Sequence, residues 1–169
     1  MSRCMAIDKF KRIDSFTVDH TRLLRGLYVS RLDILESGDV VTTFDVRMTE
    51  PRLNRPLPGA AMHTIEHLAA TWLRNNPEWA KRILYWGPMG CRTGFYLLMQ
   101  GNLKPENIMS LMLEMFRFIA DFEGEVPGAS EVECGNASYH DLHGAKVAAK
   151  VYVDEVLSVI TPAQTAYPQ

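Results

Sequence analysis

Residues 62–75 read MHTIEHLAATWLRN, and the apolar residues of this stretch recur at helical spacing. In a helix, His63 and His67 lie one turn apart on the same face, and Glu66 stands beside them. Two imidazoles placed in this way can bind one metal ion, and a neighbouring carboxylate can move protons for a group bound there. The stretch therefore predicts a helix with a metal site; a solvated helix face without a metal is the plain alternative.

A metal site with two histidines needs a third protein ligand, and a catalytic site also keeps one position open. Cys134 lies in an irregular stretch where its thiolate can reach out, and thiolate with imidazole suits a divalent transition metal. His140 and His143 lie near the start of the last expected helix, so we expect both outside the ligand set. Cys91 and several carboxylates are the other candidates, and a buried, inert Cys134 is the alternative to ligation.

Cys91 lies in a second stretch whose residues could form part of a catalytic site. Gly90 precedes it and Thr93-Gly94 follows it, so a ligand could approach the backbone closely. Backbone amides in such a turn, or a nearby cation, would lower the pKa of the thiol and supply a thiolate as proton acceptor. These residues leave open whether Cys91 is catalytic or merely packed. We expect no role for Cys4.

Around the motif helix, strands and further helices follow one another irregularly. Short apolar or β-branched runs indicate strands, and Arg47 falls near the end of the first. Pro105 suits the first turn of a helix that ends before Gly124. Without a regular βαβ alternation, we predict an α+β fold, a two-layer sandwich with a mostly antiparallel sheet packed against helices. The expected strands are 40–47, 81–86 and 94–99, and the further helices are 105–123 and 142–160.

The composition is that of an ordinary globular domain. The 169 residues are 47% apolar and 22% charged, which allows a core without disulfides. The net charge of −2 leaves no basic excess to attract nucleic acid or anionic lipid. The sequence shows no signal peptide or membrane span, so we expect a cytoplasmic protein whose cysteines are free thiols. We predict one domain over 1–169, with loosely held ends at 1–10 and 163–169.

Several separated blocks of the chain resemble one family, the bacterial S-ribosylhomocysteine lyases, in the same order along the sequence. The combination of the His-x-x-Glu-His helix, the Pro-Met-Gly-Cys-x-Thr-Gly turn and a downstream Cys-Gly pair is highly specific. The matching blocks are Ser15–His20, Phe44–Arg47, His63–His67, Gly87–Gly94, Cys134-Gly135 and His140–Leu142.

The resemblance implies a reaction and a set of roles. It implies cleavage of the thioether of S-ribosylhomocysteine, by carbonyl migration and β-elimination, to homocysteine and a dihydroxypentanedione, the precursor of a quorum-sensing autoinducer. It also implies a homodimer with active sites at the interface and one divalent metal per subunit, natively Fe(II), with Zn or Co(II) as substitutes. The implied residues are His63, His67 and Cys134 for the metal, Glu66 and Cys91 for acid–base catalysis, Ser15, His20 and Arg47 for the ribose, and Arg74 near homocysteine.

One block departs from the family pattern. Family members commonly carry Asp-Ile-Ser before Pro-Met-Gly-Cys, whereas this chain has Tyr85-Trp86-Gly87. Recognition of the homocysteine part must then be arranged differently, or the substrate preference is altered, unless Tyr85 and Trp86 are simply core aromatics.

Two other functions fit parts of the sequence. A class of small metallopeptidases also carries the inverted zinc motif, but it would need a carboxylate as third ligand and an extended peptide groove. A non-catalytic protein with a structural metal would close the shell with four protein ligands, and Cys91 could be the fourth. The set of side chains around the metal motif therefore separates these hypotheses.

Overall fold

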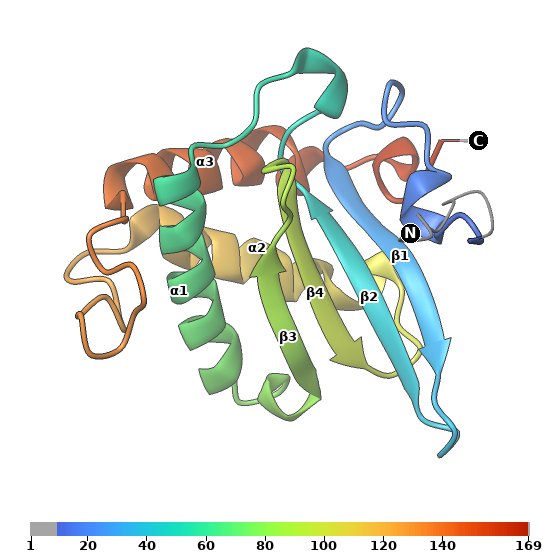
Figure 1. Cartoon of the computed structure of the whole chain (residues 1–169), viewed down its shortest axis with the longest axis horizontal. Coiled ribbons are helices and arrows are strands. Elements are labelled where there is room, and N and C mark those ends of the chain that lie inside the picture. The colour runs from blue at the N-terminus through green and yellow to red at the C-terminus, as the bar shows by residue number, and fades with distance from the viewer. Residues whose placement is uncertain (1–9, 169) are drawn as a thin grey trace, which may run out of the picture.

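Alternating apolar side chains build one sheet from four antiparallel strands within residues 10–168, the part of the chain that the computed structural model describes (Figure 1). Cys4 lies outside the described residues. The strand order is β1-β2-β4-β3, and every neighbouring pair is antiparallel. The predicted α+β class with an antiparallel sheet is therefore confirmed. The strands are β1 Gly26–Ile34, β2 Val40–Arg47, β3 Ile83–Pro88 and β4 Gly94–Gln100, and the α-helices are α1 Gly59–Asn75, α2 Pro105–Asp121 and α3 Leu142–Glu155.

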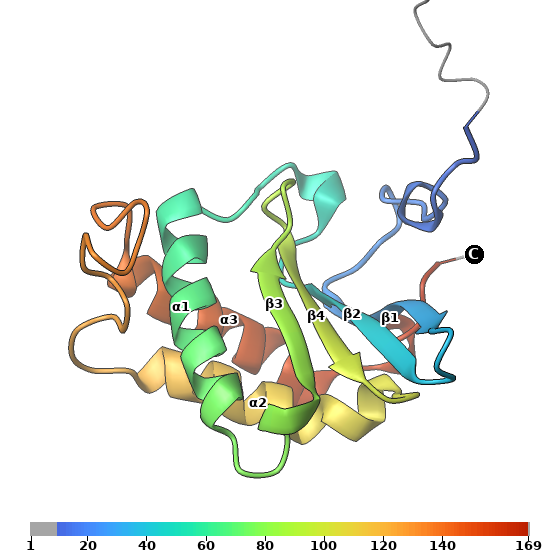
Figure 2. The same ribbon diagram turned by 60° about the horizontal axis from the view of Figure 1, so that its bottom comes forward.

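The helices form the second layer. In Figures 1 and 2, α2 and α3 cover one face of the sheet and α1 lies alongside the edge strand β3. Every second residue of the central strands points into this layer, among them the fully buried Phe44 of β2 and Phe95 of β4. Burial of such large apolar side chains provides the main driving force for the fold. None of the described helices has the length and apolar character that a membrane crossing requires.

The register of the central strands brings two distant parts of the sequence together. Arg47, the last residue of β2, pairs with Gly94, the first residue of β4. At Gly94 the strands approach so closely that a Cβ atom would clash with the backbone oxygen of Val46. The side chain of Arg47 therefore lies next to the turn between β3 and β4, which carries Cys91.

Two elements begin at places other than those predicted. Helix α1 starts three residues earlier than Met62, at Gly59, because the Met62 N–H bonds the Pro58 oxygen at 3.0 Å and closes the first turn. Strand β3 starts at Ile83 rather than residue 81, because a 3₁₀ turn, Ala80–Arg82, takes up the preceding residues.

The last helix and the first strand also differ from the prediction. Helix α3 ends at Glu155 because Val156 leaves helical geometry, and a separate 3₁₀ turn, Leu157–Val159, follows. Strand β1 was not predicted from the sequence. A register shift between Val29 and Arg31 interrupts its alternation, which hides the period-two signal.

Candidate functional site

The first turns of α1 present the two histidines of the metal motif. His63 and His67 are half-buried, with ring centroids 4.7 Å apart and ring planes at 86°. His63 Nδ1 lies 2.7 Å from the backbone carbonyl oxygen of Tyr139, and His67 Nδ1 lies 2.9 Å from the backbone carbonyl oxygen of Pro127. A carbonyl oxygen can only accept, so in the neutral tautomer of each ring Nδ1 carries the proton and Nε2 offers a lone pair. These backbone contacts preset both rings as ligands.

The loop between α2 and α3 brings the predicted third ligand to these lone pairs. The Cys134 Sγ lies 3.4 Å from His63 Nε2 and 3.8 Å from His67 Nε2. In Figure 1 this loop stands beside the end of α1 where the helix begins. One thiolate and two imidazoles form a donor set that suits a divalent transition metal. The three residues predicted as metal ligands thus lie together.

His140 is a fourth member of this cluster, although we expected it outside the ligand set. The ligand atoms of His63, His67, Cys134 and His140 all lie within 4.8 Å of one another. His140 Nδ1 lies 3.1 Å from the Thr64 hydroxyl, and its Nε2 lies 4.0 Å from the Cys134 sulfur. Burial, followed by the charges of His63 and His67, lowers the pKa of His140 and favours its neutral form.

The ring planes distinguish His140 from the other two histidines. Its ring stacks on that of His63, with centroids 4.0 Å apart and planes only 17° from parallel. A metal bound by an imidazole lies near the ring plane, in the direction of the nitrogen lone pair. One ion cannot lie near two planes that run almost parallel at this separation. In this arrangement His63 and His67 can share an ion, whereas His63 and His140 cannot.

The composition of the cluster also bears on the alternative functions. Among the described residues, no carboxylate belongs to this ligand group, whereas a metallopeptidase of the inverted-motif class would need one. Cys91 does not belong to it either, so the closed shell with Cys91 as fourth ligand is not the arrangement observed. The donors present fit a three-ligand site with room for a substrate oxygen.

Cys91 instead forms a second group with Arg47 and Thr93. The Arg47 Nη1 donates to the Thr93 hydroxyl at 2.5 Å and reaches the Cys91 Sγ at 3.9 Å. The Thr93 oxygen lies 3.0 Å from the same sulfur. Because Arg47 can only donate, Thr93 accepts from it and its own O–H is free to donate to sulfur. The group is arranged to stabilise a thiolate.

The titration of Cys91 follows from these contacts. Burial raises the pKa of the Cys91 thiol, but the hydrogen bonds from the Thr93 hydroxyl and backbone N–H and the charge of Arg47 outweigh it. The net effect lowers the pKa below that of an ordinary cysteine. The thiol itself is exposed and so can reach a substrate. A low-pKa, accessible thiolate is the form expected of a catalytic cysteine.

The other predicted site residues belong to neither of these two groups. Glu66 is half-buried on α1 beside the metal motif. Ser15 lies in a short 3₁₀ turn of the N-terminal segment and lines a hollow with Thr43 and Tyr96. His20 is exposed in the same segment.

Arg74 lies near the other end of α1. Its guanidinium donates to the backbone oxygens of Ile83 at 3.3 Å and Leu84 at 3.2 Å. Arg74 thus holds the end of α1 to the start of β3, next to Tyr85.

The chain departs from the family pattern at Tyr85-Trp86-Gly87, and the two aromatic side chains of this block lie in different surroundings. Trp86 is a core residue, 5% exposed and stacked on Phe95 with ring centroids 4.7 Å apart. Tyr85 is 52% exposed, and its ring lies over Gly87, where a side chain would clash with it. In this conformation the Tyr85 ring occupies the space that a side chain at position 87 would take.

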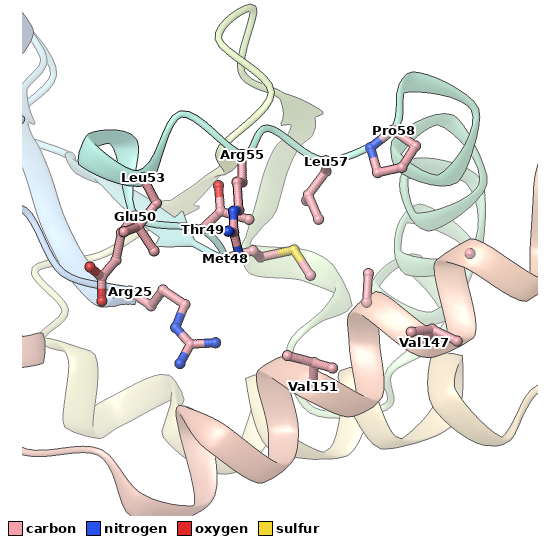
Figure 3. A pocket seen from close by; sticks show the side chains of 12 residues that line it. Arg25, Met48, Thr49, Glu50, Leu53, Arg55, Leu57, Pro58, Val147 and Val151 are labelled. Atoms are coloured by element: carbon pink, nitrogen blue, oxygen red, sulfur yellow. The ribbon is translucent and has the colours of Figure 1, made fainter.

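A separate apolar hollow of about 470 Å³ lies between the loop after β2 and helix α3 (Figure 3). Met48, Leu57, Val147 and Val151 line it, and Arg25 lies at its edge. It includes none of the predicted metal or catalytic residues.

Comparison with known proteins agrees with this geometry. The model of the S-ribosylhomocysteinase (LuxS) family matches residues 13–163. The chain belongs to this family. Within the LuxS family, it is 59% identical to the S-ribosylhomocysteine lyase of Phocaeicola vulgatus, over 94% of this chain and 98% of that protein. It is 54% identical to the S-ribosylhomocysteine lyase of Porphyromonas gingivalis and 52% identical to that of Desulfotalea psychrophila, in each case over 94% of this chain and 99% of the relative.

The LuxS resemblance already present in the sequence blocks is thus confirmed. Sequence reasoning missed the contacts of His140, although the residue is part of a block that resembles the family. It also missed Asp45, which lies within the Phe44–Arg47 block and bonds Arg47 through both carboxylate oxygens. The available signal was an acidic residue two positions before an arginine in the same predicted strand.

Proposed function

We propose that this protein is a metal-dependent S-ribosylhomocysteine lyase. The observation that carries the proposal is the pairing of two groups in one family member. One is a thiolate and imidazole cluster on α1, and the other is an activated Cys91 on the turn after β3. The relatives that match nearly the whole chain bear the name of this activity. The absence of a carboxylate from the described ligand group speaks against the metallopeptidase alternative.

We propose His63, His67 and Cys134 as the ligands of a divalent ion, Fe(II) in the native enzyme with Zn or Co(II) as substitutes. When bound, such an ion supplies Lewis acidity to the substrate's carbonyl oxygen. The protein must then move protons, because each carbonyl migration removes one from a carbon atom and delivers one to the next.

Cys91 and Glu66 divide this proton transfer in our proposal. The Cys91 thiolate removes and returns carbon-bound protons, since Thr93 and Arg47 stabilise its charged form. Glu66 exchanges protons with hydroxyl oxygens and with the departing sulfur. The final elimination breaks the carbon–sulfur bond, and the sulfur leaves as the thiol of homocysteine. The products together contain all the atoms of the substrate.

The release of homocysteine from S-ribosylhomocysteine tests this activity directly. The Co(II)-loaded protein should release it anaerobically at an enzymatic rate, followed with a thiol reagent. The Glu66→Ala variant should lose roughly 10²–10⁴-fold in rate while it keeps its metal, because Glu66 lies outside the ligand group. Absence of release by the metal-replete wild type would mean that the Tyr85 region has redirected the site to another substrate.

We further propose that the enzyme is a homodimer with its active sites at the interface. The N-terminal segment supports this proposal, because Phe10, Ile13 and Phe16 are 65%, 55% and 64% exposed. Apolar side chains grouped in this way mark interaction surfaces. The segment also carries Ser15 and His20, which we propose as ribose contacts.

Mixed dimers can test whether this segment serves the partner's metal centre. His20→Ala and His63→Gln should each be inactive alone. When the two variants exchange subunits, each mixed dimer should regain one intact site, because one chain supplies the segment and the other the metal. Activity should therefore reappear on mixing. A mixture that forms mixed dimers and remains inactive would show that each segment serves its own chain.

A further inference from the structure

The last described residues of the chain lie on β1 and reach the buried side of the Cys91 group. A 3₁₀ turn, Pro162–Gln164, places the backbone of Gln164 so close to Gly26 that a Cβ there would clash. The Gln164 side-chain amide donates to the Arg25 oxygen at 3.1 Å. Beyond this anchor, the ring of Tyr167 stacks on that of Tyr28, with centroids 4.9 Å apart and planes at 16°.

The hydroxyl of Tyr167 completes the hydrogen bonding of a buried carboxylate. It donates to Asp45 Oδ2 at 2.8 Å, and Asp45 is only 1% exposed. The same carboxylate accepts from Arg47 Nε at 3.0 Å and from Nη2 at 2.6 Å. Arg47 is 3% exposed, so this ion pair lies out of contact with water. A buried pair depends strongly on the further hydrogen bonds that satisfy it.

The hydrogen bonds continue from this pair to the thiol. Arg47 uses Nη1, the nitrogen that does not bond Asp45, to contact Thr93 and Cys91. The orientation of the guanidinium is therefore fixed on one side by Asp45, and the field at the sulfur depends on that orientation. Tyr167 is the first member of a continuous series of contacts that ends at Cys91.

We propose that Tyr167 is a positioning residue for the reaction, and that it acts through Asp45 and Arg47 on the thiol of Cys91. The inference rests on the proposed role of Cys91 as proton acceptor. It concerns a residue beyond 163, where the match to the family model ends.

The electrostatic surroundings support a donor role for Tyr167. Burial, and then the charge of Asp45, raises the pKa of Tyr167 well above that of an ordinary tyrosine, so its phenol keeps its proton. Burial and Asp45 act in the same way on Tyr28, whose pKa rises to about 12. Tyr28 donates to the Leu24 oxygen instead, at 3.0 Å. The other phenols whose pKa is raised by burial and by Asp45 are Tyr96 and Tyr152.

Removal of the Tyr167 hydroxyl should raise the pKa of Cys91. Without this hydrogen bond, the negative charge of Asp45 is less well neutralised, and it cancels more of the positive field that Arg47 exerts at the sulfur. The guanidinium is also held less firmly by Asp45 and can move away from Thr93. Both effects disfavour the thiolate. In Tyr167→Phe we expect the pKa of Cys91 to rise by about half a unit, which is about a threefold change in its ionisation constant. The measurement is the pH dependence of iodoacetamide alkylation of the metal-loaded enzyme, followed by mass spectrometry of the tryptic peptide 83–92.

Tyr28→Phe is the matched control, because it removes a buried hydroxyl from the same aromatic stack, one that donates to the Leu24 oxygen and not to the Asp45 carboxylate. Its alkylation profile should coincide with that of the wild type, even if thermal unfolding shows that Tyr28→Phe loses as much stability as Tyr167→Phe. Coincident profiles for Tyr167→Phe and the wild type would overturn the proposal and leave Tyr167 as a packing residue. Alkylation needs no substrate, so this outcome is independent of whether the lyase activity is found.

Discussion

Cys91→Ala should abolish release of homocysteine and leave the metal content unchanged. The structure gives both reasons. Cys91 lies outside the group of potential ligands, so the ion does not depend on it. The thiolate is stabilised by Thr93 and Arg47, and alanine offers no group that can accept a proton. The loss of a positioned proton acceptor costs roughly 10²–10⁴-fold in rate. Initial rates and metal analysis on the same preparation measure the two quantities together.

Two further variants show whether the thiolate itself is required. Cys91→Ser keeps a hydroxyl near Thr93, but its pKa is far too high to provide a base at neutral pH, so it should be as inactive as alanine. Thr93→Val removes a hydrogen bond that lowers the pKa of Cys91. Because the deprotonated form is the active one, the rise of activity with pH should move to higher pH in this variant. Loss of metal from Cys91→Ala would instead make Cys91 a ligand.

The sequence predicted the metal cluster well because the information is local. His63 and His67 lie on one helix, and helical geometry fixes their separation before any tertiary contact forms. Cys134 follows α2 in an irregular stretch. Its ligand chemistry therefore suggested a role at the metal, but no periodicity fixed its place relative to the two histidines. The three Nδ1 contacts that orient the rings could not be predicted, because they involve backbone and hydroxyl oxygens of residues far away in the sequence.

The contacts of the Cys91 group were harder to predict from the sequence. Arg47 and Cys91 are neighbours only because β2 pairs with β4, and a shift of one residue would turn Arg47 to the other face of the sheet. The contact of Tyr167 with Asp45 joins residues 122 positions apart in the sequence and follows no periodicity. Such contacts depend on how the tail packs against β1, which no local pattern determines.

Cys134→Ala should remove the metal altogether. Two imidazoles would remain from a three-ligand set, and the ion would be lost during dialysis against a mild chelator, from roughly one per chain to near zero. The Co(II) form should also lose the near-ultraviolet absorption that arises from thiolate bound to the ion. The helix should survive, since Ile65 and Leu68 of α1 remain buried in the core. Circular dichroism of the variant would confirm that the fold is retained.

His140→Gln is the matched comparison, because His140 lies in the same cluster but its ring runs almost parallel to that of His63. This variant should keep both the metal and the thiolate absorption, because its Nε2 cannot share an ion with His63 in this geometry. If His140→Gln lost the metal as completely as Cys134→Ala, four protein ligands would close the shell and leave no position for a substrate oxygen. The comparison therefore separates a catalytic centre from a structural one through metal binding alone.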